Sequence, residues 1–183
     1  DRKLRETNYS DIRKFFLPNG DRIPSLDEVL KLVNGRVPIF FEIKTQDFGL
    51  GSKIGLLEKQ VADSLESYSG QVAIMSYNPY SILKLGKLVP HIPRGLVTDR
   101  FSYQEWPNLP ESYRNTLRRI DCSSPLQISF ISHNFKDLKN SIIQKQKDLG
   151  IEILCWTVRN TKEAESSLKI ASNITFEGFE AKI

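Results

Sequence analysis

The sequence predicts an α/β fold built on a parallel sheet. Six short apolar runs alternate with segments of helical period, and strands joined through helices pair in parallel through right-handed crossovers. No glycine-rich turn of the dinucleotide-binding type follows any of these runs, which favours a closed TIM-type barrel over an open doubly wound sheet. Because an eight-stranded barrel takes about 250 residues, six strands in 183 residues predict one domain, residues 1–183, that lacks the first two βα units.

Each predicted element has its own signal in the chain. Strands, rich in β-branched and aromatic residues, are expected at Ile39–Lys44, Val72–Ser76, Arg94–Val97, Gln127–Ser132, Ile151–Val158 and Asn173–Phe176. Helices, with apolar residues three and four apart, are expected at Ser25–Val33, Ile54–Tyr68, Pro79–Leu88, Tyr113–Ile120, Phe135–Leu149 and Thr161–Ile170. Lys3–Gly20 is expected to be irregular with one short helix, so the absent units should precede Asp1.

The composition is typical of a soluble globular protein. The chain is 39% hydrophobic and 26% charged, enough to bury a sizeable core. Its net charge of +4 is mild, and the basic residues are scattered rather than gathered into a stripe with aromatic residues, which argues against nucleic-acid binding. No apolar run approaches the roughly 20 residues of a membrane span, so no transmembrane segment is expected.

The two cysteines, Cys122 and Cys155, show no metal-binding spacing. They indicate free thiols in a reducing compartment, with a single disulfide in an exported protein as the alternative. We therefore expect a cytoplasmic protein, and a periplasmic one remains an open alternative. The oligomeric state has no signal in the sequence.

The most informative feature is an acid and a base two residues apart in an apolar strand. This spacing puts Glu42 and Lys44 on the same strand face. The pair is either a structural ion pair, or a cation ligand beside a group that neutralises an anionic substrate. A third possibility is a barrel enzyme in which Lys44 forms a Schiff base, although a close carboxylate keeps a lysine charged.

An Ile-Pro-Ser-Leu helix start is followed by a turn and then by the Glu-x-Lys strand, and further segments follow in register. These segments are Ile23–Leu30, Val33–Pro38, Phe41–Lys44, Met75–Pro79, Pro93–Val97 and Leu149–Arg159. Together they resemble the glycerophosphodiester phosphodiesterase family, and the order of the first three carries most of this resemblance. The resemblance extends from Ile23 to Phe179. The last strand departs from the commoner Ile-Thr-Asp-x-Pro ending and resembles a bacterial subgroup that ends in Phe-Glu-Gly-Phe.

The resemblance implies a TIM-type (β/α)8 barrel of the phospholipase C-like phosphodiesterase type. Such an enzyme hydrolyses glycerophosphodiesters to glycerol 3-phosphate and an alcohol with a divalent cation, Mg²⁺ or Ca²⁺, in lipid and glycerol metabolism. It also implies a metal ligand at Glu42 and a phosphate contact at Lys44. The other residues expected to contact the substrate, around the rim of the barrel, are Ser76, Tyr77, Trp156 and Glu177.

The family's histidine motifs, His-Arg-Gly and His-Asp, and its Glu-x-Asp cannot be located in this sequence. The chain has two histidines. His91, bracketed by prolines before a strand, is expected at the bottom of the barrel. His133 ends a strand-like run and is the candidate catalytic residue, because catalytic groups collect at the carboxyl ends of barrel strands. One histidine cannot supply an acid and base pair, so an inactive barrel remnant that binds a ligand or partner is an alternative function.

Overall fold

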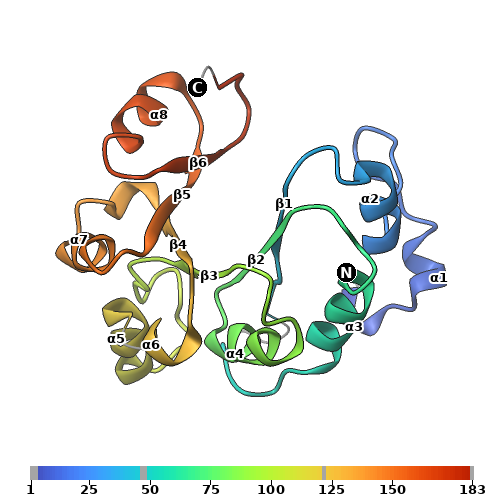
Figure 1. Ribbon diagram of the computed structural model, residues 1–183, viewed down its shortest axis with the longest axis horizontal. Helices are drawn as coiled ribbons and strands as arrows, with labels where there is room; N and C mark the ends of the chain where they lie inside the picture. Colours follow the sequence, from blue (N-terminus) through green and yellow to red (C-terminus); the bar gives the residue numbers. More distant parts are fainter. Residues whose placement is uncertain (1–3, 46–48, 121–122, 182–183) are drawn as a thin grey trace.

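The computed structural model describes residues 4–45, 49–120 and 123–181. Six strands form one curved sheet, in which each strand pairs in parallel with its neighbours in the chain. They are β1 (Ile39–Glu42), β2 (Val72–Ser76), β3 (Arg94–Thr98), β4 (Phe130–Asn134), β5 (Glu152–Val158) and β6 (Asn173–Phe176). Figure 1 shows the strands on the inner side of an arc, with the helices around its outside. The predicted α/β class and parallel sheet are confirmed, and the six strands form an open half-barrel.

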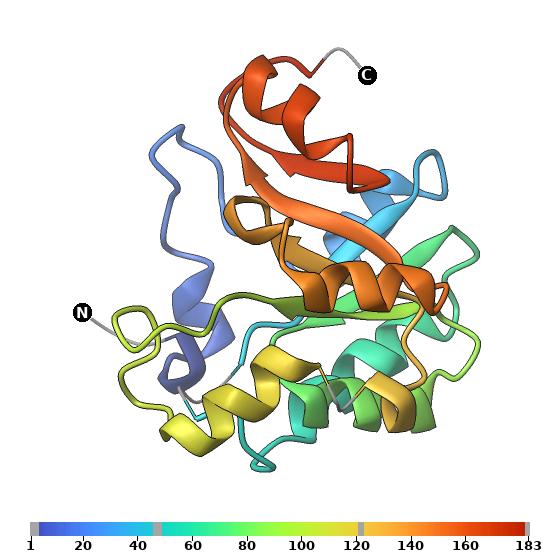
Figure 2. The same cartoon turned by 90° about the vertical axis from the view of Figure 1, so that its left-hand side faces the viewer.

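In the described part of the chain, one short 3₁₀ turn and two helices precede the first strand, and the other helices connect successive strands on the outer side of the sheet. The helices are α1 (Tyr9–Ile12), α2 (Leu26–Val33), α3 (Leu56–Leu65), α4 (Pro79–Leu88), α5 (Glu111–Arg119), α6 (Ser123–Leu126), α7 (Ser141–Asp148) and α8 (Thr161–Ser167), with the 3₁₀ turns η1 (Leu4–Glu6) and η2 (Phe135–Asp137). In Figure 2, α7 lies in front of the strands, on their outer face. None of the helices within the described ranges has the length and apolar character needed to cross a bilayer.

The helix starts follow the expected capping chemistry. At α2 the Ser25 hydroxyl accepts from the Glu28 backbone N–H, and the Glu28 carboxylate accepts from the Ser25 backbone N–H, which satisfies two N–H groups that the helix leaves open. The single helix predicted at Phe135–Leu149 is instead η2 followed by α7. Asn140 accounts for the break, because its side chain accepts from the Ile142 backbone N–H and begins a new helix.

The strand ends differ from the sequence predictions by a few residues. β4 begins at Phe130 rather than Gln127, because Gln127 has a left-handed backbone with φ of 49° that a strand cannot contain. β1 ends at Glu42, although the Ile43 N–H still donates to the Met75 carbonyl at 2.8 Å. The helix α6 was not predicted.

The buried core lies between the sheet and the helices. One apolar cluster packs Ile131 and Ile153 of the sheet against Ile143 of α7, and a second packs Ile74 against Leu65 and Leu85 of α3 and α4. All six are no more than 3% exposed. Strand residues that alternate with these face the inside of the arc.

The inner face is apolar near the amino ends of the strands. Phe40 of β1 meets Phe130 of β4 edge to face, with ring centroids 5.7 Å apart, yet 53% of Phe40 is exposed. Gly95 of β3 makes room for this contact, since a Cβ there would lie 2.4 Å from the Phe130 ring. A cavity of about 700 Å³ opens at this end and includes His91, which confirms that His91 lies at the bottom of the half-barrel.

Candidate active site

The carboxyl ends of the strands gather polar and aromatic side chains on the inner face. The pairing of Glu42 with Met75, of Val97 with Ser132 and of Asn134 with Trp156 puts these positions on one face of the sheet, because side chains alternate along each strand. We call this set the rim: Glu42, Lys44, Tyr77, Asp99, Asn134 and Trp156.

Glu42 and Lys44 form an ion pair at the rim. Lys44 Nζ lies 2.7 Å from Glu42 Oε1, and the side chains are 75% and 23% exposed, respectively. Glu42 Oε1 itself is buried and accepts no hydrogen bond of acceptable geometry within the described residues, despite the short distance to the ammonium. The pair predicted from the strand spacing is therefore present, and the carboxylate keeps capacity for a further partner.

Tyr77 brings an aromatic cluster to the rim. Its ring lies 5.0 Å from Trp106, 5.9 Å from Trp156 and 6.2 Å from Phe101, measured between centroids. Burial raises the pKa of the Tyr77 phenol far above its usual 10, and the charges of nearby carboxylates raise it further, Asp99 first among them. The phenol is therefore a neutral O–H group at any ordinary pH.

Trp156 lies on β5 with its indole N–H directed into the sheet. Nε1 donates to the Ser132 carbonyl at 3.0 Å, which fixes the plane of the ring. The half-buried ring packs against Tyr77. Thus the structure brings together four of the residues predicted to form the site: Glu42, Lys44, Tyr77 and Trp156.

Ser76 and Glu177 are placed differently. Ser76 is fully buried, and its hydroxyl donates to the Ile43 carbonyl at 2.7 Å and accepts from the Asn78 N–H at 3.1 Å. It faces the helices and links β1 to the start of α4. Glu177 follows β6 and forms an ion pair with Arg159, both more than half exposed, so its charge is neutralised locally.

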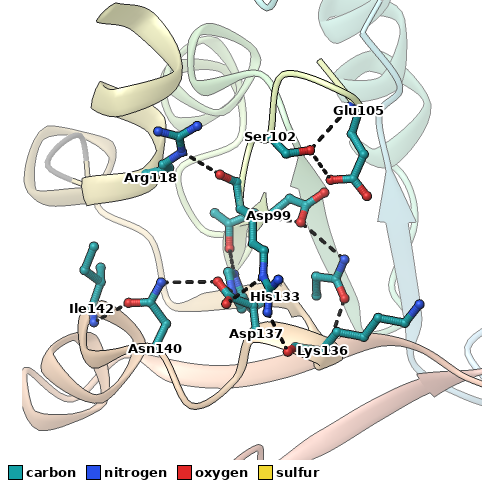
Figure 3. Close-up of polar contacts among 12 residues, drawn as sticks. Asp99, Ser102, Glu105, Arg118, His133, Lys136, Asp137, Asn140 and Ile142 are labelled. Atoms are coloured by element: carbon teal, nitrogen blue, oxygen red, sulfur yellow. Dashed lines mark hydrogen bonds and ion pairs between the residues drawn. The ribbon is translucent and has the colours of Figure 1, made fainter. Parts of the chain in front are cut away.

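His133 faces the outer side of the sheet, away from Glu42. It is 3% exposed. Its Nδ1 lies 2.8 Å from Thr98 Oγ1, and its Nε2 lies 3.3 Å from Asp137 Oδ2, as Figure 3 shows. Asp137 also accepts from Arg100 Nε at 2.8 Å and from Asn140. The structure therefore does not bring His133 together with the rim residues.

The surroundings of His133 fix its charge state. Burial lowers the pKa of His133, and the hydrogen bond and charge of Asp137 only partly oppose this. Burial alone would raise the pKa of Asp137, but hydrogen bonds from Asn140, Arg100 and His133 bring it below its usual value. A neutral imidazole that donates from Nε2 to Asp137 and accepts at Nδ1 from Thr98 satisfies both contacts.

Asp99 and Asn134 are rim residues that the sequence analysis missed. Asp99 follows β3 directly, is 6% exposed, and its Oδ1 accepts from the Arg100 N–H at 2.6 Å and from Asn134 Nδ2 at 3.2 Å. The sequence held a signal, because both are polar residues at the carboxyl end of an apolar run. The strand ends set at Val97 and Ser132 left them outside the predicted strands.

The metal site implied by the family resemblance is incomplete in these residues. No group of three or more His, Cys, Asp or Glu side chains that could hold a metal ion occurs in the part of the chain that the structure describes. Glu42, whose buried Oε1 has the Lys44 ammonium beside it but no hydrogen bond of good geometry, fits as one ligand. A hard cation takes six or more oxygen ligands, so one carboxylate does not make a site. Of the cysteines, Cys155 is a buried free thiol, and Cys122 lies outside the described residues.

The fold and the rim define a half-barrel α/β protein with a charged and aromatic site at the carboxyl ends of parallel strands. Residues 1–174 match the model of the Glycerophosphoryl diester phosphodiesterase family. The chain belongs to this family.

Two curated relatives agree. The chain is 26% identical over 165 residues to YhdW of Bacillus subtilis, which is named as a glycerophosphodiester phosphodiesterase, a match that covers 88% of this chain and 61% of the relative. It is 28% identical over 153 residues to the glycerophosphodiester phosphodiesterase of Caldanaerobacter subterraneus, covering 82% and 56%. The chain thus spans about six tenths of the length of these relatives.

Solved structures share the fold. A glycerophosphodiester phosphodiesterase from Parabacteroides distasonis matches 94% of this chain and 68% of its own, with a TM-score of 0.68 and 16% identity. An Oleispira antarctica phosphodiesterase in complex with the product sn-glycerol-3-phosphate matches equally well, at 13% identity. At these identities the likeness establishes the fold.

Proposed function

We propose that this chain forms the larger part of a metal-dependent glycerophosphodiester phosphodiesterase, which yields glycerol 3-phosphate and an alcohol. The family membership supports the reaction. The observation that carries the proposal is the ion pair of Glu42 and Lys44 on the inner rim, beside Tyr77 and Trp156. An acid and a base at the carboxyl ends of barrel strands are typical of a catalytic site.

The rim residues take distinct roles in this reaction. The largely exposed ammonium of Lys44 can reach a phosphoryl oxygen and neutralise its charge. The phenol of Tyr77 stays protonated and so is available as a hydrogen-bond donor. The Trp156 ring, which is held by the hydrogen bond from its Nε1 to the Ser132 carbonyl, provides an apolar surface against which the ester can pack.

Glu42 would hold a divalent cation, which when bound supplies positive charge to the phosphate. Further ligands and groups that move protons are needed, because no group of three or more potential ligands occurs among the described residues and neither described histidine faces the rim. We propose that they belong to the roughly four tenths of the relatives' length that the match leaves uncovered. On this proposal the barrel of the intact protein includes the two βα units that are absent here.

The alternative is a protein that binds the ligand without turnover. The observation in its favour is that neither histidine of the chain faces the rim. Schiff-base chemistry at Lys44 has less support, because the carboxylate 2.7 Å away keeps the ammonium charged.

The test is the release of glycerol 3-phosphate from glycerophosphocholine by the full-length protein. We expect the chelator EDTA to abolish release, and Glu42→Gln to weaken Mg²⁺ and Ca²⁺ binding measured by calorimetry. Glu165→Gln, an exposed carboxylate on α8, is the matched control and should change neither. Full activity in Glu42→Gln would overturn the proposal, and binding of glycerol 3-phosphate without turnover would establish the alternative.

A further inference from the structure

We propose that Asp99 and Asn134 form the subsite that binds the glycerol hydroxyl groups. This inference rests on the proposed function and adds the orientation of the substrate. It would put the phosphate toward β1, near Lys44, and the glycerol toward β3 and β4. The pair is separate from Glu42 and Lys44 and has no role in the argument for hydrolysis.

The Asp99 carboxylate is held in place and keeps one oxygen available. Oδ1 accepts from the Arg100 N–H and from Asn134 Nδ2. Oδ2 takes no hydrogen bond from the described residues. Oδ2 is not one of the buried side-chain atoms that lack a partner, so it is open to solvent although the residue as a whole is only 6% exposed, and a ligand hydroxyl can donate to it there.

The strand register puts the pair on the inner face. Thr98 pairs with His133 in the ladder between β3 and β4, and both side chains face outward, where they meet at 2.8 Å. Side chains alternate along strands, so the next residues, Asp99 and Asn134, face inward. In Figure 3 the Asp99 carboxylate points away from His133, along the dashed line that marks the hydrogen bond it accepts from the side-chain amide of Asn134.

The outer contacts hold this inner pair. Asp137 accepts from Arg100 Nε at 2.8 Å, and the Arg100 backbone N–H is the donor that fixes Asp99 Oδ1. The Thr98 to His133 contact ties β3 to β4 one residue earlier. Hydrogen bonds on the outer face, between Thr98 and His133, and on the inner face, between Asp99 and Asn134, thus join the ends of β3 and β4. His133 and Asp137 are therefore positioning residues for the subsite.

The negative charge of Asp99 determines which part of the substrate can bind next to it. A carboxylate repels a phosphate group and accepts hydrogen bonds from hydroxyl groups. Asp99 and Lys44 are two strands apart, about 10 Å at the spacing of a sheet. This separation suits an extended glycerol phosphate with one contact at each end. The charge of Asp99 is also the strongest charge effect on the Tyr77 phenol, which places both groups on the same rim.

The competing explanation is that Asp99 only orders the loop after β3. Calorimetry with two ligands separates the explanations: glycerol 3-phosphate and propyl phosphate, which has the phosphate but no hydroxyl groups. We expect Asp99→Asn to weaken glycerol 3-phosphate binding by about 10-fold or more, the range for hydrogen bonds to a charged group, and to leave propyl phosphate binding unchanged. Asn134→Ala should act in the same direction and more weakly.

The controls address folding and the proposed function itself. Asp63→Asn, an exposed carboxylate paired with Lys59 on α3, should change neither affinity. Lys44→Met should weaken both ligands alike. If Asp99→Asn does not fold, Asn134→Asp in its place, which sets a like charge beside Asp99, should reduce glycerol 3-phosphate binding selectively.

Two results would overturn the inference: equal losses for both ligands in Asp99→Asn, or unchanged glycerol 3-phosphate binding. In either case a Lys44-dependent affinity leaves the phosphodiesterase proposal standing. Absence of binding in the wild type, or binding that does not depend on Lys44, would instead refute the proposed site.

Discussion

Replacement of His133 by leucine should remove a specific pH dependence of stability. The buried imidazole has a pKa below its ordinary 6.5, so between its folded and unfolded pKa values the unfolded chain binds a proton that the folded chain does not. The free energy of unfolding therefore rises with pH through this window, by at most about 1.4 kcal/mol per pH unit. This contribution to the free energy of unfolding is fully present above the pKa that His133 has in the unfolded chain. It is lost as the pH falls from there to the lower pKa of the folded protein.

The same substitution also has a cost that does not depend on titration. Leucine leaves Thr98 Oγ1 without its 2.8 Å partner and removes one donor from Asp137, which we expect to cost about 1–3 kcal/mol at about pH 8. Urea unfolding from about pH 8 to about pH 5 measures both effects. The curves of wild type and His133→Leu should converge as the pH falls.

The matched control is His91→Gln, which changes the other, exposed histidine and should leave the wild-type slope intact. Parallel curves for wild type and His133→Leu would refute the argument, because the buried imidazole would then titrate equally in both states.

Three further predictions concern the scaffold and are read by urea unfolding near neutral pH. Gly95→Ala should destabilise the protein by about 1–3 kcal/mol or more, because the new Cβ would lie 2.4 Å from the Phe130 ring and 2.6 Å from its carbonyl oxygen; an unchanged midpoint would contradict this close approach. Ser81→Ala should cost about 1–3 kcal/mol, since the buried Glu58 carboxylate loses the hydroxyl that donates to it at 2.6 Å; the comparison is Ser112→Ala, which changes an exposed serine of α5. Glu177→Gln should change stability by less than about 1 kcal/mol, because its ion pair is exposed; a larger loss would mean that the pair is buried in solution.

The strand and helix order could be predicted because each signal is local. The 3.6-residue period of α2 and its Ser25 cap, and the apolar run of β2, need no knowledge of the rest of the chain. The errors occurred where one backbone angle decides the outcome. Gln127 has a φ of 49°, so β4 begins three residues later than predicted. The Asn140 cap starts a new helix within residues 135–149, although the apolar pattern of that segment alone is that of one continuous helix.

The site was harder to predict because side-chain direction depends on register. A one-residue difference decides whether a group at a strand end faces the rim or the helices. His133 and Asn134 are neighbours in the sequence, yet they face opposite sides of the sheet. Glu42 and Lys44 were predicted together because their two-residue spacing makes their common face independent of register.

The sequential order of the strands also bears on how the chain folds. Among the described strands, each pairs with the strands before and after it, so each of these pairings closes a single crossover. Stability in such an arrangement is shared between adjoining units, much as in solenoid repeats. The pairings within this part of the sheet are therefore all between strands that are neighbours in the chain.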